Sequence, residues 1–327
     1  MMRRLYVLRW PATIALLAFV VLHDGIGDAW RLVERAGPLL LWLVPLHALP
    51  LLLDARAWHL LLARRIALCT LWWIAAVREA VSRLLPVFGI GGELVGIRLA
   101  GRYLRDTGYV SASVVVEVLV TIAVQYSFAM LGLVLLFFGS ANADVARAVG
   151  IALLLSLPLP VALFALLRRG GIFQRLGRIA KRFVPRIDGR ALDARIRALL
   201  GQPRLLAAAF AWQLAGYLLG SAEIYFALAL LGHPAGIGAS IAIEALTQAV
   251  RQAVFIAPAG IGVQEVTMVA LAGAFGIDRE AALSLALVRR MRELAWGTIA
   301  IVLWQTVESL PTQTVDERPA TGRRTQQ

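Results

Sequence analysis

The sequence predicts an all-α protein that crosses a membrane several times. Of its 327 residues, 60% are hydrophobic and only 16% are charged, whereas a soluble domain is about half apolar and about a quarter charged. Many of the apolar runs reach the roughly 20 residues that a helix needs to cross a bilayer. Pro/Gly breaks interrupt two of the runs. We therefore expect a multi-pass membrane protein with about six transmembrane helices and two re-entrant helical hairpins, or alternatively eight spans.

The first predicted span, residues 8–22, is short and lies next to the amino terminus. The opening MMRRLYVLRW carries three arginines before an apolar stretch, as a signal peptide does. No small-x-small cleavage site follows, only HDGIGDAW, so we predict a retained signal-anchor helix. The other predicted spans are the apolar runs 38–62, 110–138, 145–167, 205–231 and 281–309.

Two further regions, 66–105 and 237–276, predict the hairpins. Each contains a helical stretch of about 20 residues, then a Pro/Gly break, then a helix of about a dozen residues, which is too short to span. The breaks contain PVFGIGGE and PAGIGVQE, in which proline and glutamate are seven residues apart. Irregular backbone is tolerated inside a membrane where it lines a cavity. The breaks therefore indicate the tips of hairpins beside a polar cavity.

The two breaks are separated by 172 residues, and the same offset relates their neighbours. It places 38–62 on 210–234, 110–138 on 282–310, and Glu117 on Arg289. Three crossings separate the paired elements, so the copies are predicted to point in opposite directions, as in many transporters. We predict one transmembrane domain over 1–309, with repeat A at about 38–138 and repeat B at about 210–309.

The distribution of basic residues predicts the orientation. Segment 168–204 holds eleven basic residues against Asp188 and Asp193, so the positive-inside rule makes it a cytoplasmic loop. Both termini then lie in the cytoplasm, and 310–327 forms a disordered cytoplasmic tail. The loop either sets topology only or also binds anionic headgroups. Because the net charge of +13 is concentrated beside apolar runs, we expect no nucleic-acid partner.

Charged residues inside the spans indicate a buried polar region. One charge at the centre of a transmembrane helix costs about 2.5–3.5 kcal/mol, and Arg289, Arg290, Arg292 and Glu293 share one span. Residues three or four apart lie on one helix face, and several helices carry such a polar stripe. The stripes are Arg78, Glu79, Ser82 and Arg83; Ser113, Glu117, Thr121 and Gln125; Gln213, Gly216, Gly220 and Glu223; Glu244, Gln248 and Arg251; and Arg289, Glu293 and Gly297.

These stripes have two readings. Paired charges could simply hold helices together, with Glu117 or Glu244 facing Arg289 or Arg251, or the set could form a pathway for a headgroup or a proton. Gly216 and Gly220 form a GxxxG pattern, which close helix packing explains.

Several classes of function lack their motifs. The single Cys69 excludes an internal disulfide and a CxxC site, and the four scattered histidines form no HExxH pair, so we expect no metal. The breaks lack the glycine order and the strand of a dinucleotide or Walker loop, and no nucleophile elbow is present. The sequence therefore predicts neither a cofactor nor catalytic residues, and a protein that is not an enzyme.

Four stretches carry a resemblance to a known family. They resemble the flippase-like transmembrane domain of the lysylphosphatidylglycerol synthase superfamily. The stretches are LLPVFGIGGELVGIRL (84–99), SASVVVEVL (111–119), IAPAGIGVQEVTMVALAGAFG (256–276) and EAALSLALVRRMRELAWG (280–297). Within this superfamily, three stretches are most similar to the branch associated with hopanoid biosynthesis: HALPLLLDARAWHLLL (47–62), GGELV and EALTQAVRQAVF (244–255). The resemblance extends to about residue 309.

This resemblance implies a protein of the cell inner membrane that moves or exposes polar lipids, with hopanoids carried towards the outer membrane. The implied partners are membrane lipids and the enzymes that synthesise hopanoids or phospholipids. The alternatives are a scaffold for such enzymes and the membrane subunit of a lipid-modifying transferase. Because a short polar segment follows the last predicted span, we expect no aminoacyl-transferase domain like that of the full synthases. Ser82 and Arg83 stand where relatives commonly carry an asparagine. The resemblance implies lipid-pathway positions at Pro86, Gly91, Gly92 and Glu93 in the first break, at Pro258, Gly260, Gly262 and Glu265 in the second, and at Glu117 and Arg289. The polar stripes add Glu244, Gln248, Arg251 and Glu293 to this predicted lipid pathway.

The glutamates after the two breaks have two possible roles. Glu93 and Glu265 lie near the starts of the second hairpin arms, where a carboxylate favours the helix dipole. They either cap these helices or bind a headgroup or a proton.

Overall fold

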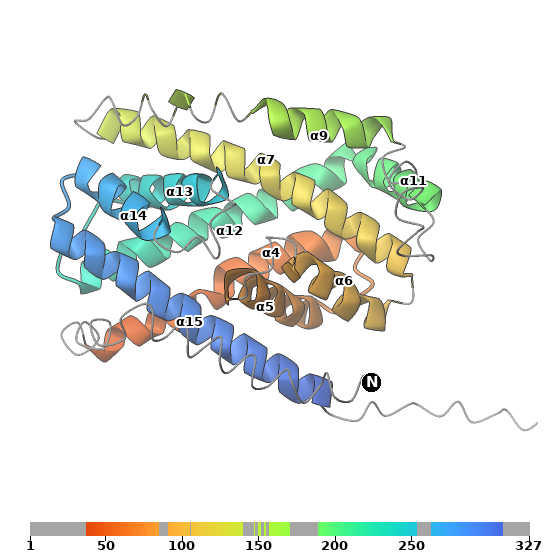
Figure 1. Cartoon of the computed structure of the whole chain (residues 1–327), viewed down its shortest axis with the longest axis horizontal. Coiled ribbons are helices and arrows are strands. Elements are labelled where there is room, and N and C mark those ends of the chain that lie inside the picture. The colour runs from red at the N-terminus through yellow and green to blue at the C-terminus, as the bar shows by residue number, and fades with distance from the viewer. Residues whose placement is uncertain are drawn as a thin grey trace, which may run out of the picture.

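Helices make up the regular structure of the described residues, as predicted. The computed structural model describes residues 37–84, 91–104, 106–139, 157–170, 189–253 and 263–309, with Arg147, Gly150, Ile151 and Leu154 (Figure 1). The amino-terminal half contains η1 (Pro38–Trp42), α3 (Leu43–Leu46), α4 (Ala48–Leu61), α5 (Leu68–Leu84), α6 (Gly91–Tyr103) and α7 (Thr107–Gly139). The other half contains α9 (Pro158–Arg169), α11 (Gly189–Leu200), α12 (Pro203–Leu230), α13 (Ile237–Ala253), α14 (Val263–Ala274) and α15 (Arg279–Ser309).

Three helical stretches of the described chain are long and apolar enough to cross a membrane. They are Pro38–Leu61, Thr107–Gly139 and Pro203–Leu230, at the predicted spans 38–62, 110–138 and 205–231. The predicted span 281–309 is also one continuous helix, α15, but its charged first half makes it less apolar. Helix α9 covers the end of the predicted span 145–167, and the span at 8–22 lies outside the described residues.

Many large apolar side chains lie on the outer surface and several charged side chains lie in the interior, unlike in a soluble protein. Phe138 and Val266 are 83% and 70% exposed, while Glu117 and Glu293 are 2% and 4% exposed. An apolar outer surface is stable in lipid, and buried charges avoid the cost of facing it. The fold is therefore that of an all-α membrane protein.

The two predicted hairpin regions each form a pair of packed helices. Helix α5 packs on α6, and α13 packs on α14, with the second helix shorter in both pairs. Gly92 allows the first pair to approach closely, since an added Cβ would lie 2.2 Å from Ser82 Oγ and 2.5 Å from the Arg78 carbonyl oxygen. The breaks themselves, 85–90 and 254–262, lie outside the described residues.

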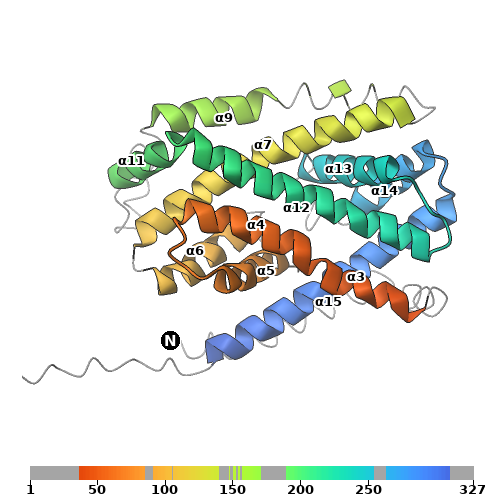
Figure 2. The ribbon, with the colours of Figure 1, turned by 180° about the vertical axis from the view of Figure 1, so that it is seen from behind.

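The helix contacts are consistent with the proposed repeat. The repeat relates α4 to α12, α5 to α13, α6 to α14 and α7 to α15. Under this exchange, the contact between α7 and α13 corresponds to the contact between α15 and α5. The contacts of α4 with α5 and of α12 with α13 exchange in the same way, and α4 packs against α12 itself (Figure 2). The repeat and the opposite orientation of its two copies both stay predictions.

Part of the predicted basic loop is a helix rather than a loop. Helix α11 buries Leu192, Ile196 and Leu199 and packs against α7. Its Arg195 forms an ion pair with Asp106, which also accepts a hydrogen bond of 3.1 Å from the Tyr109 backbone N–H at the start of α7. The small burial of Asp106 acts to raise its pKa, but the hydrogen bonds from Arg195 and Tyr109 outweigh it and lower the pKa. The apolar residues of the segment explain why it folds onto the protein.

Candidate functional site

A polar cavity of about 240 Å³ lies between the helices of the two halves. Its lining comes from α4, α5, α6, α7, α12, α13 and α15, and from the turn between α3 and α4. Five arginines, six carboxylates and one histidine take part, although charged groups in a membrane protein are costly unless they are paired or hydrated. These are Arg78, Arg83, Arg251, Arg289, Arg292, Asp54, Glu79, Glu93, Glu117, Glu223, Glu244 and His47.

Arg78 on α5 organises one end of the cavity. Its Nη1 lies 3.0 Å from both carboxylate oxygens of Glu117 on α7, and its Nη2 donates to Glu93 on α6. The guanidinium carbon lies 4.7 Å from the ring centroid of Trp58, a favourable cation–π position. Arg78 therefore joins both arms of the first hairpin to α7 with all its charge compensated.

Arg289 on α15 organises the other end. It makes two contacts with the Glu244 carboxylate on α13, one of them from Nη2 to Oε1 at 3.0 Å. Gln248 donates to Glu244 over 2.9 Å, and Arg251 Nη2 donates to Gln248 Oε1 over 2.7 Å. The anticipated pair of Glu244 with Arg289 is present. Glu117, however, pairs with Arg78, because α5 rather than α15 faces it.

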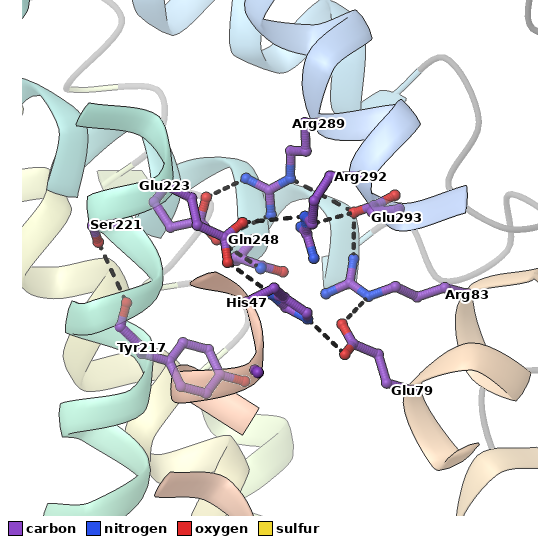
Figure 3. A network of polar contacts seen from close by, with 12 residues as sticks. His47, Glu79, Arg83, Tyr217, Ser221, Glu223, Gln248, Arg289, Arg292 and Glu293 are labelled. Carbon is purple, nitrogen blue, oxygen red and sulfur yellow. Dashed lines mark hydrogen bonds and ion pairs between the residues drawn. The ribbon is translucent and has the colours of Figure 1, made fainter. Parts of the chain in front are cut away.

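Six charged or ionisable side chains form a closed ring of contacts between these two ends (Figure 3). Arg83 contacts Glu79 and Glu293 at 2.7 and 2.6 Å. His47 contacts Glu79 and Glu223 at 2.8 and 2.7 Å, and Arg292 contacts Glu223 and Glu293 at 3.2 and 4.0 Å. We call His47, Glu79, Arg83, Glu223, Arg292 and Glu293 the charged ring.

His47 and Asp54 are site residues that the sequence analysis missed. His47 is 8% exposed, and Asp54 accepts a hydrogen bond of 3.1 Å from Gln213. His47 belongs to no metal-ligand spacing, and Asp54 lies on no polar stripe. Their position inside a predicted span was the available signal, because an ionisable residue there normally has a polar partner.

The structure gathers many of the proposed pathway residues and leaves others undescribed. Glu93, Glu117, Glu244, Gln248, Arg251 and Arg289 line the cavity, and Glu293 lies beside it in the charged ring. Gly91 begins α6, where Gly92 packs against α5. Glu265 lies on α14, but its side chain is outside the described part, as are Pro86, Pro258, Gly260 and Gly262.

Arg251 differs from the other cavity arginines. Within the described residues, no carboxylate lies at ion-pair distance from it, and its buried Nε has no hydrogen-bond acceptor. The Nη1 of Arg292 also lacks an acceptor there. Unused guanidinium donors favour oxygen-rich groups such as phosphates, carboxylates and hydroxyls. Among the residues that the structure describes, no three His, Cys, Asp or Glu side chains are grouped to hold a metal ion.

Fold and site together define a helical membrane protein with a charged internal cavity. Residues 6–301 match the family of the lysylphosphatidylglycerol synthase transmembrane region, so the chain belongs to this family. Membership confirms the resemblance to the superfamily and connects the chain with membrane-lipid handling, but it does not distinguish the hopanoid branch. No curated protein and no solved structure matches the chain.

Proposed function

We propose that this protein moves polar lipids between the leaflets of the bacterial inner membrane, with hopanoids as the expected cargo, and that it catalyses no reaction. The observation that carries this proposal is the cavity of about 240 Å³ lined by charged side chains inside a membrane protein. Carrying a polar headgroup through hydrocarbon is costly, and a polar cavity lowers that cost. The lipid tails remain in the bilayer, so only the headgroup needs this route.

Arg251 is the proposed contact for the headgroup. Arg78 and Arg289 each bind a glutamate through charge-assisted hydrogen bonds, so their main donors are occupied. Arg251 keeps its charge without a carboxylate among the described residues, and it faces the same cavity. A headgroup phosphate or hydroxyl would supply the missing acceptor.

The proposed location and partners follow from charge and family. The basic residues of segment 168–204 support a cytoplasmic position for both termini, in a cell with an inner membrane. Enzymes that make hopanoids or phospholipids are the proposed partners, because they would supply the lipid on the cytoplasmic side. Cysteine labelling at Asn142 and His233 tests the orientation, since both are expected outside.

Reconstitution tests the transport proposal. Purified protein is reconstituted in phosphatidylcholine vesicles that contain a trace of phosphatidylglycerol or phosphatidylcholine with a fluorophore on one acyl chain. Dithionite added outside then reduces the fluorophore in the outer leaflet. Protein-free vesicles keep the inner-leaflet probe, whereas the wild type is expected to expose it. Unlabelled hopanoid with a hydroxylated side chain is expected to compete and slow the movement of the probe.

Arg251→Ala tests the headgroup contact, with Arg279→Ala at the exposed start of α15 as the matched control. We expect the first variant to slow movement about tenfold, equivalent to about 1.4 kcal/mol, and the second to leave it unchanged. Equal rates for both variants would remove Arg251 from the pathway. If the probe moves no faster in wild-type vesicles than in protein-free vesicles, transport is contradicted. Loss of a modified lipid from a deletion strain would then favour the transferase role. An unchanged lipid composition of that strain would favour the scaffold role.

A further inference from the structure

His47 lies between two carboxylates in the interior of the protein. Its Nδ1 is 2.7 Å from Glu223 Oε1 on α12, and its Nε2 is 2.8 Å from Glu79 Oε2 on α5. Both distances are those of strong hydrogen bonds, and the histidine residue is 8% exposed. Each ring nitrogen of His47 therefore has one carboxylate partner.

Two simultaneous hydrogen bonds in this trio require an additional proton. A neutral imidazole has one N–H donor, and its other nitrogen is an acceptor that would face the oxygen lone pairs of a carboxylate. Two hydrogen bonds require either an imidazolium between two carboxylates or a neutral imidazole beside one carboxylic acid. In both cases His47, Glu79 and Glu223 bind one proton more than a neutral imidazole and two carboxylates do.

The charged neighbours favour the proton on the imidazole. Arg83 on α5 lies 2.7 Å from Glu79, and Arg292 on α15 lies 3.2 Å from Glu223, so each carboxylate of the trio has an arginine of opposite charge beside it. Arg292 itself opposes a charge on His47, but two carboxylates in direct contact outweigh one arginine. The remaining neighbour from α15 is the edge-on ring of Trp296, 5.6 Å away between centroids.

His47 also joins the two halves of the charged ring. One half is His47, Glu79 and Arg83 from segment 47–83, and the other is Glu223, Arg292 and Glu293 from segment 223–293. Only the contacts of His47 with Glu223 and of Arg83 with Glu293 connect the two halves within the ring. With His47 protonated, the first half carries a net charge of +1 and the second −1. Loss of the Nδ1 proton, which faces Glu223, removes this attraction and one of the two connecting hydrogen bonds.

We propose that His47 is a proton-binding site, and that release of its proton opens the charged ring and couples lipid movement to a proton gradient. This inference deepens the proposed transport function. In the closed state the imidazolium donates one N–H to Glu79 and one to Glu223. On opening, the Nδ1–H bond gives its proton to water in the cavity, and the Nδ1 lone pair then faces the Glu223 carboxylate. The contact between segments 47–83 and 223–293 weakens, and protonation restores it.

Nitrogen NMR of histidine-labelled protein tests the protonation state without requiring transport. His47→Gln assigns the signal. A second sample with glutamine at His23, His59 and His233 leaves His47 as the only histidine, so the assignment does not depend on the first variant folding. At pH 7, where an ordinary histidine is mostly neutral, we expect both nitrogens of His47 to be protonated. A neutral imidazole at pH 7, with one protonated nitrogen, would overturn the proposal.

A pH gradient across lipid vesicles tests the coupling. With one proton per lipid, a gradient of about one pH unit is expected to shift the steady-state distribution of acyl-labelled phosphatidylglycerol by up to about tenfold in wild-type vesicles. His47→Gln is expected to abolish the shift, and His233→Gln, at the exposed loop after α12, to preserve it. Movement that ignores the gradient in the wild type would overturn the proton proposal and leave transport standing. Absence of any movement would contradict transport, and the NMR result would still decide the proton site.

Discussion

The two hairpins place arginines at nearly equivalent positions, yet their surroundings differ. The repeat offset of 172 relates Arg78 on α5 to Val250, the neighbour of Arg251 on α13. Arg78 contacts Glu117, Glu93 and the Trp58 ring, whereas Arg251 contacts only the Gln248 amide among the described residues. A fully paired buried charge holds helices together, but an unpaired one remains costly until a ligand compensates it. The first hairpin therefore has the features of a structural site, and the second those of a binding site.

The same comparison extends to the long helices. In each half, one buried ion pair joins the first hairpin arm to the following long helix: Arg78 to Glu117 and Glu244 to Arg289. The charges are exchanged, since the acid lies on α7 and the base on α15. Each arginine has a second carboxylate: Arg78 also contacts Glu93, and Arg289 lies 3.6 Å from Glu293, which Arg83 shares. Loss of one partner is therefore expected to affect the two halves to different extents.

Glu244→Ala is expected to have the largest effect on stability. It leaves Arg289 with only Glu293, which Arg83 and Arg292 share, and breaking a buried ion pair in this way costs about 3–5 kcal/mol. Glu117→Ala is the matched change in the other half, and it should cost less because Arg78 keeps its contact with Glu93. Thermal unfolding of both variants in detergent measures the difference. Equal losses would show that the two halves are electrostatically equivalent.

Gly92→Ala is expected to disrupt the packing of the first hairpin. The added methyl group would clash with the Arg78 carbonyl oxygen, and overpacking of this kind costs about 1–3 kcal/mol. Gly220→Ala on α12 is the control, because an added Cβ there meets no atom within 4 Å. Alanine at Gly220 should stabilise the helix by up to about 1 kcal/mol. A tolerated Gly92→Ala would contradict the close approach of α5 and α6.

Asp106→Ala is expected to have a smaller effect at the surface. It removes the amino-terminal cap of α7, which costs about 0.5–2 kcal/mol. Because the pKa of Asp106 is lowered on folding, its contribution is present above the pKa of the unfolded state and is lost as the pH falls through the lowered value. The difference in unfolding temperature between variant and wild type should therefore shrink in acid. A constant difference would show that the carboxylate charge does not contribute.

Arg251→Met is expected to leave stability almost unchanged, because no ion pair is broken. Replacing an uncompensated buried charge with an apolar side chain of similar length is neutral or stabilising. Lipid movement should nevertheless fall, in contrast to the loss of stability expected at Glu117. A large fall in the unfolding temperature would show that Arg251 is structural, like Arg78.

Composition and periodicity predicted much of the fold. Three of the predicted spans match long apolar helices because hydrophobic length alone determines them. Residues on the polar stripes, such as Glu117 and Glu244, line the cavity because a 3.6-residue period identifies the inward face of a helix. The helical part of segment 189–200 was missed, since its charge dominated the interpretation and its buried Leu192 and Ile196 did not.

The pairing of the charges was predictable only in part. Opposite stripes suggested Glu244 with Arg289, but Glu117 had several possible partners, and the choice of Arg78 depends on how α5 lies against α7. His47 has no periodic pattern around it, and its role arises from three helices that meet at one point. Such contacts depend on tertiary placement, which a single sequence does not encode in its local periodicity.

Blocking the cavity tests the central claim most directly. Gly220 lines the cavity with free space around it, and the only other cysteine to remove is the exposed Cys69. In a Cys69→Ser background, Gly220→Cys is labelled with a bulky thiol reagent and reconstituted, with Gly273→Cys on the exposed face of α14 as the control. We predict that labelling stops lipid movement at Gly220 and leaves it intact at Gly273. Unchanged movement in the fully labelled Gly220→Cys protein would contradict the cavity as the lipid route.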